Sequence, residues 1–385
     1  MTQQHQAVDV VGGVDTDKDT HTAAVLDTAG RQLGSARFPA TAAGYGQLLD
    51  WMRGFGTVVT IGVEGTGSYG AGLARHLTGA GIEVVEIDRP DRKARRWQGK
   101  SDPVDADAAA RAALAGRRTG TPKDRDGQVE ALRALRVARR GAVSHRADVV
   151  KQMKALIVTA PERVRAELSA LTTTRLVGVC ADTDVPDGQV WDPAAAVRLA
   201  LRSLARRVQH LSGEITDLDK VISRLVTAIA PKLLAVNGVG ADSAGQLLVT
   251  AGDNPHRLRS EAAFAMLCGV APLPASSGRT HRYRLNRGGD RQANTTLYRV
   301  VLCRLRWDPA TLVGWPGGIA PPGSHRTERE PLGSLRSSHR DPVGMDAQAQ
   351  CANSPGSRSR SPVHHALNRL NGRSRLYFLP AHRIR

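Results

Sequence analysis

The chain opens with VDVVGGVD (8–15), THTAAVLDT (20–28) and RQLGSARFP (31–39), three short runs of strand-forming residues. Turn residues separate these runs, so they predict an antiparallel meander. The apolar residues of TAAGYGQLLDWMRGF (41–55) then recur with helical spacing, and its first residue, a threonine, can cap the helix. The next run, TVVTIGVEG (57–65), predicts a buried strand. The N-terminal part of the chain is therefore predicted to be an α/β domain.

A second helix and a further strand complete this pattern. YGAGLARHLTGAG (69–81) has helical spacing, its final glycine fits a helix C-cap, and IEVVEID (82–88) is typical of a strand. Three meandering strands followed by helix, strand, helix and strand is the element order of the RNase H-like fold. We therefore predict an RNase H-like N-terminal domain over residues 8–122.

Four acidic residues stand at the ends of these elements. Asp15 and Glu64 each close an apolar run, while Asp102 and Asp105 lie three apart in the alanine-rich helix of GKSDPVDADAAARAAL (99–114), hence on one face of it. Carboxylates at two strand ends plus a helical pair are what a two-metal phosphodiester site requires. We therefore predict that the four acids bind Mg²⁺ (or Mn²⁺).

The charge balance indicates a polyanionic partner. Lys and Arg number 54 against 36 Asp and Glu, a formal net charge of +18, and nucleic acid is the leading candidate. The alternative is a solvated surface in an arginine-rich protein. The basic run RPDRKARRWQGK (89–100) directly precedes the acidic pair, where it could hold a phosphate backbone or form a solvated loop. Its candidate nucleic-acid-binding residues are Arg92, Lys93, Arg95, Arg96 and Lys100.

The cysteines and the hydropathy pattern bear on the compartment. Cys180, Cys268, Cys303 and Cys351 lie far apart and form no CxxC pair, so they suggest neither zinc nor a disulfide framework. A reducing compartment suits them. No stretch approaches the length of a transmembrane helix and no apolar signal core opens the chain. We expect a cytoplasmic protein with no membrane partner.

The middle of the chain is predicted to be a helical coiled-coil segment over residues 126–232. Apolar residues recur with helical spacing in 129–158 and again in 193–230, and a less regular linker, 172–192, lies between them. An antiparallel helical hairpin of this kind could carry dimer contacts or span nucleic acid, although packing alone would produce the same stripe.

A small, mainly α-helical C-terminal domain is predicted over residues 233–307. It contains a Gly-Val-Gly turn, 238–240, whose backbone amides could hold a DNA phosphate at the start of the next helix. From residue 308 to 385 the composition changes to Pro, Gly, Ser and Arg without helix or strand period. Two interpretations stay open for this tail, a basic disordered arm or an out-of-frame translation.

Several blocks of this sequence resemble one family. GVDTDKDTH (13–21), VEGTGSYG (63–70) and KSDPVDADA (100–108) are similar to the three blocks of the DEDD insertion-sequence transposases of the insertion sequence one-ten group. That group includes Piv-type DNA invertases and bridge-RNA-guided recombinases. Residues 237–253 and 268–300 resemble its C-terminal transposase domain. The resemblance implies a RuvC-like DEDD domain, a coiled-coil segment and a C-terminal domain that bears a serine.

The resemblance also implies roles for particular residues. The metal-binding acids would be Asp15, Glu64, Asp102 and Asp105, and the nucleophile would be Ser277, with Ser276 as the less favoured neighbour. Arginines that follow the serine would neutralise the DNA phosphate. These arginines are Arg279, Arg282, Arg284, Arg287 and Arg291.

The resemblance implies partners as well: DNA, a noncoding guide RNA and further copies of the chain in a dimer or tetramer. The favoured function is therefore a metal-dependent transposase that cuts and joins DNA through a serine. One alternative is a RuvC-like nuclease or junction resolvase that uses water as its nucleophile. Another is a decayed, inactive copy that still binds nucleic acid.

Overall fold

The computed structural model describes residues 8–87, 101–116, 119–184, 191–276, 278, 280 and 282–308. Within these ranges the N-terminal domain is built on a six-stranded sheet of order β3-β2-β1-β4-β5-β6. The first three strands form an antiparallel meander, β4 and β5 add to β1 in parallel, and β6 closes the other edge antiparallel to β5. The strands are β1 (Asp9–Thr16), β2 (Thr20–Asp27), β3 (Gln32–Pro39), β4 (Thr57–Glu64), β5 (Glu83–Ile87) and β6 (Thr119–Gly120).

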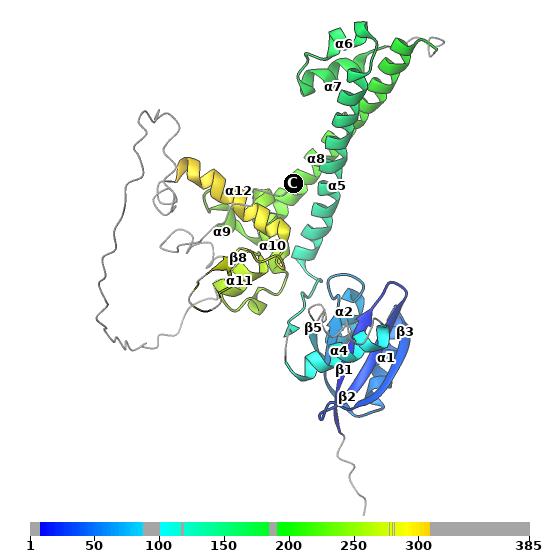
Figure 1. Ribbon diagram of the computed structural model, residues 1–385, viewed down its shortest axis with the longest axis vertical. Coiled ribbons are helices and arrows are strands. Elements are labelled where there is room, and N and C mark those ends of the chain that lie inside the picture. Colours follow the sequence, from blue (N-terminus) through cyan, green and yellow to red (C-terminus); the bar gives the residue numbers. More distant parts are fainter. Residues whose placement is uncertain are drawn as a thin grey trace, which may run out of the picture.

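In the described part of the N-terminal domain, three helices cover the two faces of this sheet (Figure 1). Helices α1 (Ala42–Arg53) and α2 (Ala71–Gly79) pack on one face, and α4 (Asp102–Leu114) packs on the other. Thr41 caps α1 as predicted, because its Oγ1 accepts a hydrogen bond from the Gly44 N–H at 3.1 Å. Large apolar residues fill the α1/α2 side, and each such buried side chain contributes about 1.5–3 kcal/mol. They include Leu48, Met52, Ile61, Leu73 and Leu77.

A long helical hairpin follows the sheet domain and projects from the molecule (Figure 1). Its two arms are α5 (Gln128–Val158) and α8 (Pro193–Ile229), and α6 (Glu162–Leu168) and α7 (Thr173–Asp182) pack at its far end. The predicted linker 172–192 is therefore more regular than expected, since α7 occupies its first part. Leu176 and Cys180 of α7 are buried in the apolar cluster at the far end, which explains why this segment is helical.

The near end of the hairpin shares its core with the C-terminal body. Leu132 of α5 and Ile222 and Val226 of α8 belong to the same apolar cluster as residues of the C-terminal helices. That body comprises α9 (Pro231–Leu234), α10 (Ala241–Ala251), α11 (Glu261–Leu267), α12 (Arg291–Trp307) and a small hairpin of β7 (Leu273–Pro274) with β8 (Tyr283–Arg284).

The segment between β6 and α5 is fastened to the C-terminal body. Asp253 accepts hydrogen bonds from the Val129 and Glu130 N–H groups and so caps the start of α5 (2.8 and 3.1 Å). Asn254 Nδ2 donates to Pro122 O at 2.8 Å, and Lys123 Nζ donates to Val249 O at 2.7 Å. The helical hairpin therefore starts from a fixed base on this body.

The prediction of an N-terminal α/β sheet domain followed by a helical region is confirmed. The domain boundaries at 122, 126, 232 and 307 stay predictions, and the tail from residue 309 lies outside the described residues. No helix in the described part of the chain is long and apolar enough to span a membrane.

Candidate nucleic-acid cleavage site

The strand register places Asp15 and Glu64 side by side. Val14 of β1 pairs in parallel with Val63 of β4, so the next residue of each strand, Asp15 and Glu64, lies at the same edge of the sheet. Adjacent strands are about 4.8 Å apart. Side chains alternate between the faces of a strand, so both acids share the face of the residues two positions earlier, Gly13 and Gly62. That face carries α4.

Helix α4 lies unusually close to the sheet because the residues in contact are small. A Cβ atom on Gly13 would collide with the backbone of Ala106 and Ala110, and one on Gly62 would lie 2.7 Å from Ala109 O. Glycine at these positions therefore lets the helix backbone rest directly on β1 and β4. Asp105, one residue before the contact with Gly13, is only 2% exposed.

Two contacts fix the direction in which α4 crosses the sheet. At its C-terminal part, Arg111 Nη1 donates to Gly30 O (2.9 Å) in the turn between β2 and β3. At its N-terminus, Asp102 Oδ2 accepts a hydrogen bond from Arg37 Nη2 of β3 at 2.7 Å. Arg37 pairs with Thr22, which pairs with Asp15. The helix therefore begins over the sheet edge where β1 and β4 end in their acids.

Asp15 and Glu64 thus lie side by side at one edge of the sheet, and Asp105 lies on α4, the helix that covers the same face. Asp102 lies at the same edge but towards β3, where Arg37 binds it. Both partners of that pair are about half exposed (60% and 48%), so it is a surface contact. Among the described residues, no group of three or more His, Cys, Asp and Glu is close enough to form a metal site. Arg37 is a contact that the sequence analysis missed.

The turn after Glu64 is held in place by local contacts. Thr16 Oγ1 donates to Glu64 O at 2.8 Å, which joins the ends of β1 and β4. Gly65 has φ of +72°, a conformation that favours glycine, and Ser68 Oγ donates to its carbonyl at 3.2 Å. The backbone that carries Glu64 is therefore well defined.

His21 belongs to the opposite face of the sheet and is not part of this acidic edge. Its ring stacks on Tyr45 of α1 with centroids 5.6 Å apart, and it is fully buried. Burial lowers the pKa of His21, and its Nδ1 lies 3.1 Å from Thr20 O. Its burial and its stacking on Tyr45 give this ring a structural role in packing α1 against the sheet.

Several predicted site residues lie outside the described residues. These are Ser277, Arg279 and all five basic residues of the run 89–100, namely Arg92, Lys93, Arg95, Arg96 and Lys100.

The described residues on either side of position 277 form a small hairpin. Ser276 Oγ accepts from the Arg282 N–H at 3.2 Å, and Ala275 N–H donates to Arg282 O at 2.8 Å, which closes the base of the loop between β7 and β8. Arg282, Arg284 and Arg287 are exposed on and after this hairpin. Arg291 begins α12.

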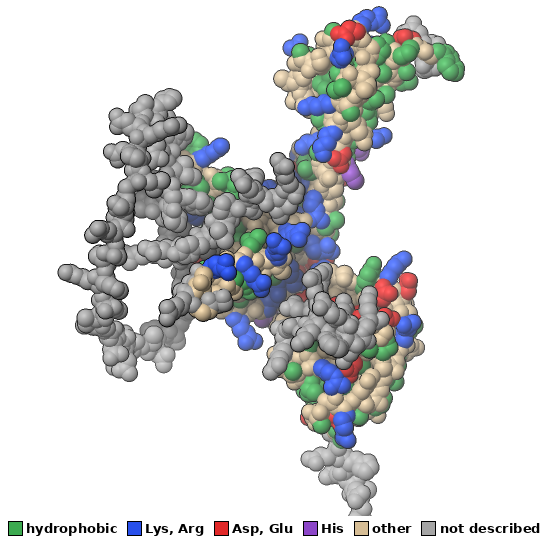
Figure 2. All heavy atoms as spheres, viewed as in Figure 1, with side chains coloured by type: hydrophobic (Ala, Val, Ile, Leu, Met, Phe, Trp, Pro, Cys, Tyr) green, Lys and Arg blue, Asp and Glu red, His purple; other side chains and the backbone are tan. Residues whose placement is uncertain are grey.

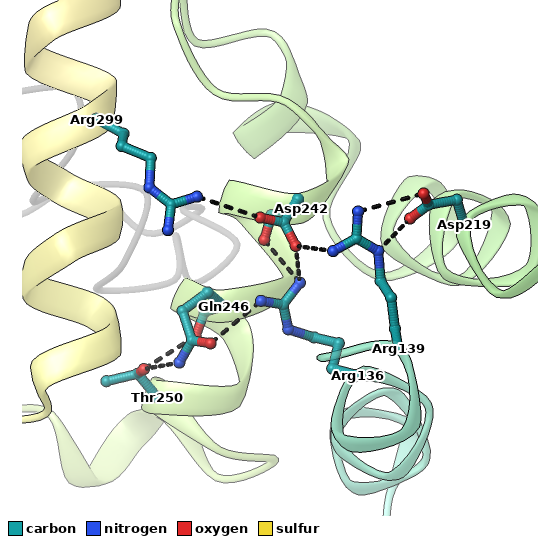
Figure 3. Close-up of polar contacts among 7 residues, drawn as sticks. All are labelled: Arg136, Arg139, Asp219, Asp242, Gln246, Thr250 and Arg299. Carbon is teal, nitrogen blue, oxygen red and sulfur yellow. Dashed lines mark hydrogen bonds and ion pairs between the residues drawn. The ribbon is translucent and has the colours of Figure 1, made fainter. Parts of the chain in front are cut away.

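The Gly-Val-Gly turn serves internal packing. Gly238 has φ of +81°, and a Cβ there would lie 3.1 Å from Val300 O of α12. Asp242, in the first turn of α10, accepts from Arg136 Nη1 at 2.8 Å and also lies near Arg139 and Arg299 (3.5 and 3.9 Å). Figure 3 shows these guanidinium groups converging on Asp242 from α5 and α12. The first turn of α10 therefore already carries an anionic group of the protein itself.

Comparison with known proteins agrees with this architecture. A DEDD-type family model described as "Transposase" matches residues 12–160, and one described as "Transposase IS116/IS110/IS902 family" matches residues 230–312. A "Probable family 20 transposase" of Pseudomonas aeruginosa is 27% identical over 238 residues, which cover 57% of this chain and 67% of that protein. The "Insertion element IS110 uncharacterized 43.6 kDa protein" of Streptomyces coelicolor is 31% identical over 116 residues, 29% of this chain and 28% of that protein.

These matches define a class of DNA-acting enzyme, the transposases of insertion sequences. Within that class the chain belongs to the IS110 transposase family. The first family model spans nearly all of the sheet domain and the whole of α5, and the second spans the C-terminal body.

Proposed function

We propose that this transposase cuts and rejoins DNA at the ends of an insertion sequence by metal-dependent phosphoryl transfer. In this proposal the N-terminal domain is an RNase H-like, RuvC-like catalytic domain. The observation that supports it best is the position of Asp15 and Glu64 at neighbouring strand ends, on the sheet face that α4 covers with its buried Asp105. Strand register sets the neighbouring positions of Asp15 and Glu64, and the contacts of Gly13 and Gly62 set the position of α4.

The donor set at this edge suits a hard divalent cation. Carboxylate oxygens are the ligands that Mg²⁺ and Mn²⁺ prefer. Asp15, Glu64, Asp102 and Asp105 would hold the ions, and Asp102 would then exchange its contact with Arg37 for the metal site. Bound ions would supply charge neutralisation at the scissile phosphate.

The C-terminal body would supply the nucleophile. Ser277 Oγ would form a bond to the phosphorus, the bond to the leaving 3′ oxygen would break, and the 3′ hydroxyl would take up a proton. A serine hydroxyl is weakly nucleophilic unless the phosphate charge is neutralised and a base accepts its proton. Arg279, Arg282, Arg284, Arg287 and Arg291 would neutralise the phosphate, and the basic run 89–100 would hold the flanking backbone.

We also propose the partners of this reaction. Two DNA sites must be joined, so the active form would be a dimer or tetramer of the chain, guided by a noncoding RNA. The reaction would take place on DNA in the bacterial cytoplasm. The formal charge of +18 favours partners of this kind.

Substitution of Asp105 tests the acidic edge. We expect Asp105→Asn to lower recombination of the native flanking DNA by about 100-fold or more, because a carboxylate is replaced by a neutral amide. Asp107→Asn is the matched control: Asp107 lies on the same helix but pairs with Arg111 at 2.7 Å. Recombination by the Asp105→Asn protein at the level of the Asp107→Asn protein would refute the proposed site.

Ser277→Ala separates the mechanisms that remain open. We expect this variant to lose both recombination and the covalent protein–DNA product while its DNA binding is retained. Cleavage that survives in the variant would favour the water-dependent nuclease or resolvase. Magnesium-independent, salt-sensitive binding without strand breakage, already in the unaltered chain, would indicate an inactive copy.

A further inference from the structure

Helix α12 has one buried side and one exposed side of very different composition. Ala293, Leu297 and Val300 pack into the C-terminal core cluster. On the opposite side, exposed residues recur three, four and seven positions apart, so they share one face of the helix. We call this set the α12 stripe: Arg291, Thr295, Tyr298, Arg299, Leu302 and Arg306.

The charge of the α12 stripe has one sign. The helix sequence RQANTTLYRVVLCRLRW contains four arginines and no acidic residue, and one of these arginines, Arg304, is buried. The Arg299 side chain is 62% exposed, and its ion pair with Asp242 is a loose one at 3.9 Å. Figure 2 shows basic side chains gathered over the C-terminal body around α12. This composition complements a polyanion.

The apolar members of the stripe indicate which form of polyanion. Tyr298 and Leu302 are each 44% exposed, and they stand between the arginines. Tyr283 of β8 is 61% exposed between Arg282 and Arg284, a second basic and aromatic group a few residues earlier in the chain. Duplex DNA offers phosphates outside while its base faces are stacked inside, so exposed rings gain little from its backbone. Unpaired bases can stack on such rings while nearby arginines hold the phosphates.

From this we infer that the α12 stripe binds an unpaired segment of nucleic acid, with Tyr298 as the stacking residue and Arg291, Arg299 and Arg306 on the phosphates. The stripe is about 22 Å long at 1.5 Å per residue, enough for several nucleotides. This inference deepens the proposed function by naming the form of nucleic acid that the C-terminal body takes. It does not require cleavage, so it can be tested separately.

The test is equilibrium binding of the full chain to a labelled 20-nucleotide single strand, as DNA and as RNA, and to the matching duplex, all in EDTA. We expect Tyr298→Ala to weaken single-strand binding about 10-fold or more, because one stacked base contributes about 1–3 kcal/mol. Duplex binding should change less than about 2-fold. Tyr298→Phe keeps the ring and should bind like the unaltered chain. A preference for the RNA or the DNA strand would identify which unpaired strand the stripe takes.

Matched variants make the result specific. Trp191→Ala removes another exposed aromatic side chain, 92% exposed beside α8, and should leave binding unchanged. Arg306→Gln should lower the slope of log K against log salt by about 0.7 for a single strand. Single-strand binding by Tyr298→Ala equal to that of the unaltered chain, or equal losses for single strand and duplex, would overturn the inference. The binding assay is run in EDTA and requires no cleavage, so failure of the catalytic proposal would appear in a different assay.

Discussion

The two faces of the N-terminal sheet are covered in opposite ways. On one face, α1 and α2 bury large side chains such as Leu48, Met52 and Leu77 against the strands. On the other face, α4 meets the strands through Gly13 and Gly62, with alanine on its own side of the contact. Bulky side chains hold the first pair of helices away from the strands, whereas the small residues let the α4 backbone approach closely.

This difference means that one face of the sheet mainly stabilises the domain, while the other mainly positions Asp105. The α1/α2 face supplies most of the buried apolar volume, and its residues act by filling space. The α4 face supplies little volume, but it sets where Asp105 lies relative to the ends of β1 and β4. Substitutions on the α1/α2 face should therefore lower the fraction of protein that is folded. Substitutions on the α4 face should change the position of Asp105 relative to Asp15 and Glu64.

The largest effect is expected at Gly13. We predict that Gly13→Val lowers the free energy of unfolding by about 4 kcal/mol or more, because its Cβ would collide with the α4 backbone, which has no rotamer to yield. Recombination should be lost along with α4 packing. Chemical denaturation and a recombination assay on the same samples would measure both.

Gly46 provides the matched control for that substitution. It lies in α1, and a Cβ there would meet nothing within 4 Å. Gly46→Val should leave stability within about 0.5 kcal/mol of the unaltered chain, since both residues are poor helix formers. If Gly13→Val and Gly46→Val lowered the free energy of unfolding by the same small amount, α4 could not be in close contact with β1.

A smaller effect is expected on the opposite face. Met52 is fully buried, and we predict that Met52→Ala lowers the free energy of unfolding by about 3 kcal/mol through loss of packing and the cavity left behind. The protein that remains folded should recombine DNA at its usual rate, because the acidic edge is on the other side. A rate loss greater than the loss of folded protein would contradict the separation of the two faces.

The smallest effect is expected at the surface pair of Arg37 with Asp102. Arg37→Gln should change stability by less than about 1 kcal/mol, because exposed ion pairs contribute little. If Asp102 exchanges Arg37 for metal, as proposed, the variant should need less Mg²⁺ for half-maximal recombination. A magnesium titration of both proteins would measure this, and a higher magnesium requirement would count against the exchange.

Much of this fold could be predicted because its signals are periodic. The runs 129–158 and 193–230 predicted α5 and α8 to within one residue, since their apolar positions recur on one face. The strands that end in Asp15 and Glu64 were equally clear. Parallel pairing of the first and fourth strands then brings these two acids together, which the fold class alone implies.

Other features could not be predicted because they depend on contacts between distant segments. Nothing in the local sequence shows that Gly13 meets Ala106 and Ala110, or that Arg37 reaches Asp102 across 65 positions. The Gly-Val-Gly turn suggested a phosphate site, but its use in packing against α12 appears only once both helices are in place. The role of Ser277 stays a prediction, because this residue lies outside the described residues.

The rigid base of the helical hairpin has a mechanical consequence. Helix α8 spans Pro193–Ile229, about 55 Å at 1.5 Å per residue, and its lower end is embedded in the core of the C-terminal body. A tilt of α8 by about 10° at its embedded end would therefore move its other end by about 10 Å. A small rotation of the C-terminal body would therefore move α6 and α7 by a distance as large as the width of a helix. A partner bound to α6 and α7 would be displaced by the same distance.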